Sequence, residues 1–335
     1  MATQSTEPLP PSLPDAPHAH DVRSIRIGYL LGALGALLFS SKGIIIKLAY
    51  EEGLDAETLL ALRLGIALPV YLAIGAWSLY DRAKQGRGLP KRGQVIAAAL
   101  VGVLGYYVAS YADFVGLQYI SAQFERMILF TFPLFVVLFG ALFFGQPARR
   151  AVLVAIAISY AGLAIIFTGR VQTVGEDAVI GAAFVLVAAV AFAFYQLLAK
   201  PLIAAVGPRL FTCIAMGGAA VASIGQFFVT HSVSEVTLSA TGFWYSVLIA
   251  GAATIAPSFL LAAALHRLTA QANATIGMLS PIATIALAWY VLDERMSAAD
   301  FAGVALVLVG VGWMTLRDTA EASAPNRAAR GGDSR

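Results

Sequence analysis

Long apolar runs recur along almost the whole chain and restrict its fold more than any other feature. A helix needs about 20 mainly apolar residues to cross roughly 30 Å of hydrocarbon. Ten segments meet this requirement: 27–48, 58–79, 94–116, 121–144, 150–168, 178–200, 209–230, 241–265, 270–291 and 299–316. The sequence therefore predicts an all-α integral membrane protein with ten transmembrane helices in a lipid bilayer.

The composition agrees with lipid as the main solvent and excludes several classes of function. Of 335 residues, 59% are hydrophobic and 12% are charged, whereas a soluble domain carries about 25% charged residues. Lys and Arg occur in short links instead of on one basic face, so nucleic-acid binding is not expected. The single cysteine, Cys213, allows no intrachain disulfide, and the histidines lack metal-ligand spacing. Neither a metal site nor a cofactor is predicted.

The charges in the links predict how the chain crosses the membrane. If the amino terminus is cytoplasmic, the inner links hold most of the basic residues: Arg82, Lys84, Arg87, Lys91, Arg92, Arg149, Arg150, Lys200, Arg209 and Arg267. The outer links hold most of the acidic ones: Glu51, Glu52, Asp55, Glu57, Glu176, Asp177, Glu235, Asp293, Glu294 and Asp300. Hydropathy alone would also fit nine or eleven spans, but this asymmetry favours an even number with both termini cytoplasmic. We expect a multi-pass protein of the cell (inner) membrane, with disordered cytoplasmic tails at 1–26 and 317–335.

The two halves of the chain resemble each other. Ser121–Pro133 and Thr269–Pro281 align without a gap at an offset of 148 residues, and the first predicted spans of the halves align at an offset of 153. Apolar helices can match by chance, but a shared mid-helix proline that follows an Ala-Gln pair favours duplication. Each unit, 27–170 and 178–316, contains five predicted helices, and an odd number inverts the second copy. Inverted repeats around a midplane site are a recurrent transporter design.

Together, these features resemble the EamA type of the drug/metabolite transporter superfamily. The resemblance covers about residues 27–316 and rests on the ten spans, the duplicated Ala-Gln…Pro pattern and the Asp293–Arg295 run after the ninth span. The matching acidic position in the first half is Gln146, which departs from the usual Glu. Family members move amino acids, drugs and other small metabolites, often outward. The resemblance therefore implies a small-molecule substrate without identifying it.

Charged residues inside the predicted spans are the first candidates for a binding site, because a charge at the bilayer centre costs about 2.5–3.5 kcal/mol. The first repeat holds most of them: Lys42, Arg63, Asp113, Glu125 and Arg126. Lys42 and Arg63 would favour a carboxylate or another anionic group, and Asp113 or Glu125 is a candidate for a coupling proton. Alternatively, Lys42 snorkels to the outer surface or forms a structural pair with Glu125 or Asp113.

Uncharged polar residues suggest a cavity on the second repeat as well. Glu125 aligns with Asn273, which begins a stripe of polar and small residues that continues through Gly277 and Ser280. Such a stripe lines either a helix interface or a cavity, and for Glu125 a position among the lipid headgroups is the alternative. Tyr107, Tyr111 and Tyr195 would supply an aromatic wall with hydroxyl groups, or else belong to the aromatic belt at the membrane surface.

Prolines fall inside several predicted spans, where each removes a backbone hydrogen bond. Pro133, Pro257 and Pro281 are interpreted as helix kinks beside the cavity, with hinges as the alternative. The fifth and tenth predicted helices are nearly free of charge and contain glycines for close packing. We interpret them as scaffold or as a face for a homodimer.

The function predicted from these features is secondary-active transport by alternating access. The solute would be a small organic metabolite such as an amino acid or a related compound, moved outward. A passive channel or facilitator of the same fold is the alternative. A membrane enzyme is disfavoured because the sequence contains no recognisable catalytic set.

Overall fold

The computed structural model describes residues 22–120, 122–147, 150–167, 176–232, 238–280, 301–314 and 316–317. Within these ranges the regular elements are helices. Their bounds in the first half are α1 Val22–Ser40, α2 Lys42–Glu51, α3 Ala56–Lys84, α4 Arg92–Gly102, η1 Val103–Val108, α5 Ala109–Tyr119, α6 Ala122–Leu129, α7 Phe132–Phe144 and α8 Arg150–Phe167. In the second half they are α9 Glu176–Val206, α10 Pro208–Thr230, α11 Ala240–Ala250, η3 Gly251–Ile255, α12 Ala256–Arg267 and α13 Ala270–Gly277, and a further helix covers Phe301–Met314.

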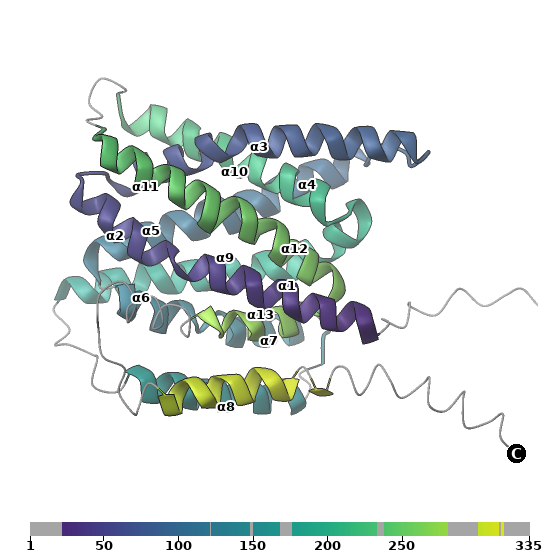
Figure 1. Ribbon diagram of the computed structural model, residues 1–335, viewed down its shortest axis with the longest axis vertical. Helices are drawn as coiled ribbons and strands as arrows, with labels where there is room; N and C mark the ends of the chain where they lie inside the picture. The colour runs from purple at the N-terminus through teal and green to yellow at the C-terminus, as the bar shows by residue number, and fades with distance from the viewer. Residues whose placement is uncertain are drawn as a thin grey trace, which may run out of the picture.

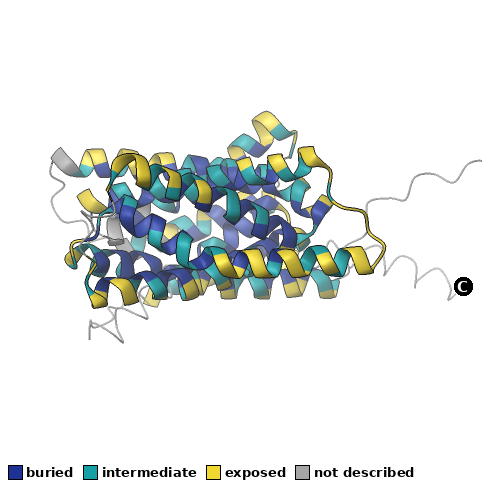
Figure 2. Ribbon diagram, turned by 90° about the horizontal axis from the view of Figure 1, so that it is seen from above, coloured by how far each residue is buried: buried dark blue, intermediate teal, exposed yellow. Residues whose placement is uncertain are grey.

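The helices run roughly alongside one another and form a bundle (Figure 1). Buried residues face its interior, whereas exposed residues lie on the outer faces of the peripheral helices (Figure 2). Many of the exposed side chains are large and apolar, among them Leu30, Leu72 and Phe143. An apolar exterior around a packed interior is the pattern of a protein surrounded by lipid.

Six described helices are long and apolar enough to cross a membrane: Val22–Glu51, Ala56–Lys84, Arg92–Tyr119, Ala178–Val206, Pro208–Thr230 and Ala240–Arg267. They coincide with predicted spans one to three and six to eight. Shorter apolar helices, Phe132–Phe144, Arg150–Gly162 and Phe301–Met314, fall in predicted spans four, five and ten. The rest of the predicted ninth span after residue 280 lies outside the described residues, as do residues 1–21 and 318–335 of the predicted tails.

The same irregularities of the helices occur in both halves at the offset of 148 residues. The helix Arg92–Tyr119 contains the π-helical turn η1 that begins at Val103, and the helix Ala240–Arg267 contains η3 that begins at Gly251. The short helices α6 and α13 also start and end at matching positions. Helix breaks and π-turns are specific features, so their shared register is stronger support for duplication than matched residue types.

Each half also packs on the other in the same way. A Cβ atom on Gly28 of α1 would lie 2.9 Å from the side chain of Leu268, at the end of α12. A Cβ atom on Gly181 of α9 would lie 2.8 Å from the side chain of Ile120, at the end of α5. These pairs correspond at offsets of 153 and 148 residues. The first long helix of each half therefore lies on the third long helix of the other half.

Glycines also permit a close crossing of α4 and α10. A Cβ atom on Gly102 would overlap the backbone of Ala215, and one on Gly218 would lie 2.8 Å from the carbonyl oxygen of Ala99. On the opposite side of the bundle, α8 and the helix Phe301–Met314 form a pair of their own (Figure 1). A Cβ atom on Gly162 would lie 2.6 Å from the carbonyl oxygen of Gly303. Small residues of this kind let membrane helices approach each other closely.

Two of the prolines that were predicted as kinks lie at breaks of the helices. The predicted fourth span is divided into α6 and α7 instead of being one kinked helix, and Pro133 lies in the first turn of α7, where no intrahelical N–H is needed. The hydroxyl of Tyr160 donates a hydrogen bond to the carbonyl of Phe130 at this break. Pro257 lies in the first turn of α12, directly after η3, and Pro281 lies outside the described residues.

Candidate functional site

A cavity of about 90 Å³ lies between helices of the two halves. Its walls come from α1–α3, α5–α7, α9, α12 and α13 and from both π-helical turns. Six of the predicted site residues line it: Lys42, Arg63, Asp113, Tyr195, Asn273 and Ser280. A mainly apolar cavity with a few polar groups is the usual form of a small-molecule site, and the structure brings most of the predicted residues to this one place.

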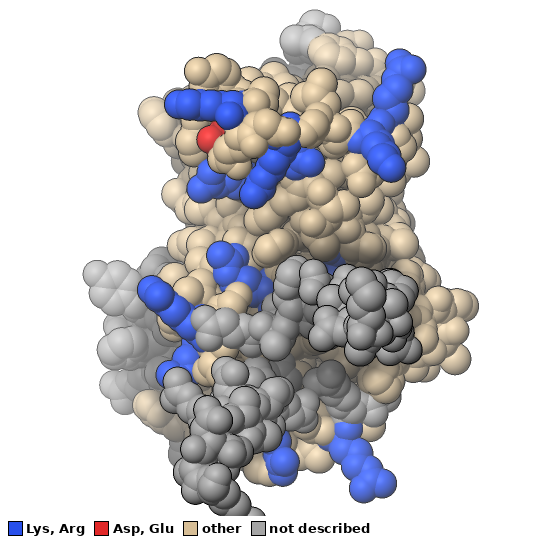
Figure 3. Space-filling model, turned by 90° about the vertical axis from the view of Figure 1, so that its right-hand side faces the viewer, with Lys and Arg blue, Asp and Glu red and all other residues tan. Residues whose placement is uncertain are grey.

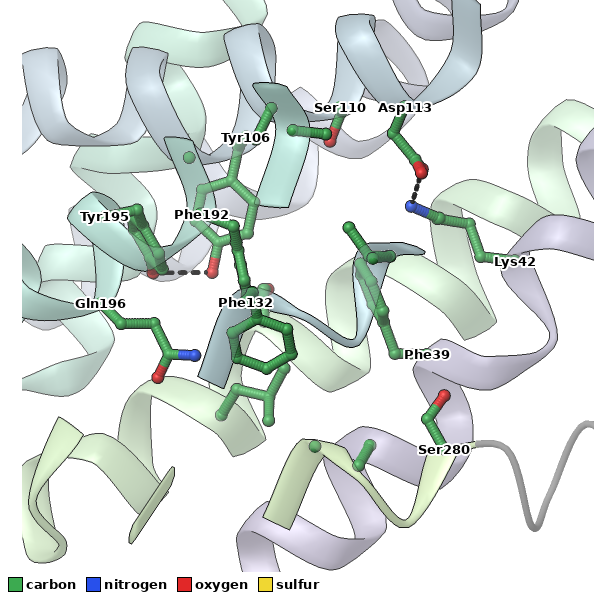
Figure 4. A pocket seen from close by; sticks show the side chains of 18 of the residues that line it. Phe39, Lys42, Tyr106, Ser110, Asp113, Phe132, Phe192, Tyr195, Gln196 and Ser280 are labelled. Carbon is green, nitrogen blue, oxygen red and sulfur yellow. Dashed lines mark hydrogen bonds and ion pairs between the residues drawn. The ribbon is translucent and has the colours of Figure 1, made fainter. Parts of the chain in front are cut away.

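Lys42 and Asp113 form a buried ion pair at one end of the cavity (Figure 4). The chain turns at Ser41, and α2 starts at Lys42, so the side chain of Lys42 points inward to α5. Its Nζ atom lies 2.5 Å from Oδ2 of Asp113, with side-chain exposures of 3% and 2%. The ammonium group also lies 4.8 Å from the centre of the Phe39 ring. The alternative of snorkelling is therefore wrong, and the pair with Asp113 is present.

Arg63 of α3 is fully buried and also lines the cavity. Its Nε atom donates a hydrogen bond to Oγ1 of Thr254 in η3, at 2.7 Å. Its guanidinium carbon lies 5.5 Å from the centre of the Phe114 ring. The two terminal nitrogens have no hydrogen-bond partner within the described part of the chain. Arg63 therefore keeps two donors without an acceptor among these residues, while it lines the cavity.

Glu125 and Arg126 extend the charged cluster at the start of α6. Oε2 of Glu125 lies 3.2 Å from Nε of Arg126, and Glu125 also interacts with Asp113. Arg126 lines the cavity, whereas Glu125 lies behind the lining with no exposed surface. The predicted cavity position of Glu125 is therefore not observed, and its burial also argues against a place among the headgroups.

Tyr195 and Asn273 form the wall supplied by the second half. The hydroxyl of Tyr195 donates a hydrogen bond to that of Tyr106, at 2.9 Å, and the ring centres are 5.0 Å apart (Figure 4). The side-chain amide of Asn273 donates a hydrogen bond to Gln196, at 2.7 Å. Ser280 faces the same space after the break that follows α13. Tyr195 occupies the position of Lys42 at the offset of 153 residues, so equivalent positions of the halves meet at the cavity.

Tyr107 and Tyr111 do not line the cavity, although they were predicted to do so. Their rings stack on each other with centres 6.2 Å apart. Tyr107 donates a hydrogen bond to Gln226 at 2.9 Å, and Tyr111 donates one to Glu57 at 2.7 Å. Both rings are partly exposed. The aromatic wall of the cavity is made instead by residues that were not predicted: Phe39, Tyr106, Phe132 and Phe192.

Several polar residues of the cavity were also missed from the sequence. Thr254, Ser258 and Gln196 line it. Ser258 forms a hydrogen bond with Tyr71 of α3, at 2.8 Å. Gln196 could have been found from the sequence, because it is an amide within a long apolar segment and directly follows Tyr195. Thr254 and Ser258 could not have been found in this way, because Ser and Thr are common at any membrane helix interface.

The apolar helices of the bundle indicate a multi-pass membrane protein, with a mainly apolar cavity that a few polar and charged side chains also line. Comparisons with known proteins agree. Residues 26–168 and 179–316 match the EamA-like transporter family, one match for each half. The chain belongs to the EamA-like transporter family. This confirms the resemblance noted from the duplicated pattern, and the members of this family are transporters.

Two further similarities extend over most of the chain. An uncharacterized transporter, YcbK, of Bacillus subtilis (strain 168) is 28% identical over 305 residues, which cover 88% of this chain and 96% of that protein. A crystal structure described only as that of a protein is 17% identical and covers 86% of this chain and 98% of its own, with a TM-score of 0.66. The latter shows a shared fold.

Proposed function

We propose that this protein is a secondary-active transporter that moves a small organic metabolite out of the cell by alternating access. One observation carries the proposal: buried charged groups of the first half and polar groups of the second half line one cavity. Buried charges in a membrane are costly and mark solute or proton pathways. Asp113 and Glu125 are the candidates for a coupling proton.

The architecture that we infer for this function is ten helices in two inverted five-helix repeats. The shared register of the π-turns and breaks supports it, as does the reciprocal packing of Gly28 and Gly181. Because the cavity lies where the halves meet, rocking one half against the other would expose it to each side in turn.

Transport is tested with the purified protein in proteoliposomes, using a panel of radiolabelled amino acids and organic acids. A solute that accumulates against its own gradient when a proton gradient is imposed, and no longer does so with an ionophore, would support coupled transport. Lys42→Met should abolish this accumulation, whereas Lys84→Met, which removes an exposed charge, should preserve it. Equilibration without accumulation under every ion gradient would favour the passive facilitator.

The charge distribution also supports cytoplasmic termini. Lys and Arg gather on the end of the bundle where α1 begins and α3 and α12 end (Figure 3). The last turn of α3 holds Arg82 and Lys84, and that of α12 holds His266 and Arg267. By the positive-inside rule, this end faces the cytoplasm.

Two single-cysteine variants test this orientation after replacement of the buried Cys213 by Ala. Gly88→Cys lies in the exposed link at the basic end, and Leu238→Cys lies in an exposed link that precedes α11. In spheroplasts, a membrane-impermeant maleimide should label residue 238 immediately and residue 88 only after permeabilisation. Labelling in the reverse order would contradict the proposed orientation.

A further inference from the structure

The buried charges of the described residues do not balance. The described residues contain five buried charged side chains: Lys42, Arg63, Asp113, Glu125 and Arg126. Each is at most 3% exposed. Three cations face two carboxylates, which leaves one positive charge in excess, and protonation of either carboxyl group would increase the excess. A buried charge without a counterion is strongly unfavourable, so a bound anion would stabilise this cluster.

The contacts show which cation is left over. Lys42 is engaged by Asp113 at 2.5 Å, and Nε of Arg126 lies 3.2 Å from Glu125. Arg63 has no ion-pair partner within the described ranges, and its one hydrogen bond, to Thr254, is made by Nε. Its two terminal nitrogens remain without an acceptor although the residue is fully buried. The free charge therefore lies on the fork of Arg63, at the wall of the cavity.

We propose that the transported solute is a small monocarboxylate whose carboxylate group docks on the two terminal nitrogens of Arg63. This assignment rests on the proposed transport function and specifies its substrate class. A guanidinium fork matches a carboxylate with two parallel hydrogen bonds. One bound carboxylate would satisfy both donors and neutralise the excess charge of the cluster.

The other residues that line the cavity indicate what the rest of the solute, beyond its carboxylate, is like. Phe39, Phe132 and Phe192 provide apolar walls beside the polar groups (Figure 4). The amide of Asn273 makes one hydrogen bond and keeps its other polar atom without a partner among the described residues. It can therefore bind a single uncharged polar group.

The size and charge of the cavity exclude other solute classes from this conformation. Its volume of about 90 Å³ is far below the roughly 300–1,000 Å³ of drug-sized sites. A second charge on the solute is also disfavoured. A zwitterion carries no net charge and would leave the excess positive charge of the cluster uncompensated, although Oδ1 of Asp113 and both side-chain oxygens of Glu125 have no hydrogen-bond partner among the described residues.

Four probes with the same carbon chain test the proposal by their charge: butyrate, butyramide, n-butylammonium and 2-aminobutyrate. Binding is measured as the rise in the thermal unfolding midpoint of the purified protein in detergent, at constant ionic strength set with sodium chloride. Butyrate should raise the midpoint by about 2 °C near ten times its dissociation constant, and the other probes should give smaller shifts. A shift by butyramide or 2-aminobutyrate as large as that by butyrate would overturn the proposal, as would no shift by butyrate.

Variants at Arg63 locate the binding. Arg63→Gln should raise the dissociation constant of butyrate by about tenfold or more, because charge-assisted hydrogen bonds are lost, and Arg63→Lys should have a smaller effect because it keeps the charge. The unliganded Arg63→Gln protein should melt at or above the temperature of the parent, since an uncompensated buried charge is removed. An unchanged butyrate affinity in this variant would overturn the assignment.

These binding measurements do not depend on transport. If butyrate binds through Arg63 but no solute accumulates in proteoliposomes, the site assignment stands and the proposed transport mechanism fails. If the protein accumulates a solute that is not a carboxylate while butyrate does not bind, the transport function stands and the Arg63 assignment fails.

Discussion

Replacing Lys42 by Met is expected to lower the free energy of unfolding by about 3–5 kcal/mol, because it leaves the buried carboxylate of Asp113 without its ion-pair partner. The pair lies 2.5 Å apart with almost no exposure, so water cannot replace the lost cation. The measurement is the unfolding midpoint in mild detergent as a function of added denaturing detergent.

A double replacement separates loss of the pair from loss of packing. Lys42→Met with Asp113→Leu removes both charges and should recover most of the stability, since replacing a buried ion pair by apolar groups of similar volume is often neutral or favourable. Equal stabilities of the single and double variants would contradict a direct interaction. Both variants should lack transport, because both residues line the cavity, so stability and transport would respond differently to the second replacement.

Replacing Gly102 by Ala is expected to destabilise the protein by about 1–3 kcal/mol or more through overpacking. The added Cβ atom would overlap the backbone of Ala215 where α4 crosses α10. A backbone cannot rotate away as a flexible side chain can, so the two helices would have to separate. The thermal midpoint in detergent and the fraction of monodisperse protein on size exclusion measure the effect.

Gly217→Ala on α10 is the matched control for this prediction. A Cβ atom at this glycine meets nothing within 4 Å, and Ala is favoured over Gly in a helix by about 1 kcal/mol. The control should therefore be neutral or stabilising. Similar destabilisation by both substitutions would show that Gly102 does not act through the crossing.

The helices and the charged cluster could be predicted from the sequence, because the hydropathy of a residue and the cost of burying its charge depend on that residue alone. A charged residue such as Arg63 within an apolar run is costly in the membrane, so it indicates a functional or structural role before its partners are known. The pairing partners could not be predicted, because they come from different helices. Lys42 had both Asp113 and Glu125 as candidates, and only the helix packing shows Asp113 as its direct contact.

It was harder to predict which side of a helix faces the cavity than to predict which residues form the helix. Tyr106 and Tyr107 are neighbours in sequence, yet Tyr106 lines the cavity and Tyr107 points to Gln226. Both lie in η1, where the π-helical turn changes the angle between successive side chains. Counting at helical spacing from Asp113 does reach Ser110 and Tyr106, and all three line the cavity. The spacing groups residues on one face, but it does not show whether that face or the face of Tyr107 and Tyr111 meets the cavity.

The reciprocal packing of the two halves has a consequence for how the protein is made. When the first half has been synthesised, the glycine face of α1 has no partner, because α12 has yet to leave the ribosome. The surface at the end of α5 around Ile120 is likewise uncovered until α9, with Gly181, has been synthesised. Neither half is therefore an independent folding unit, and the nascent first half must remain in the membrane with its charged residues incompletely covered until the second half arrives.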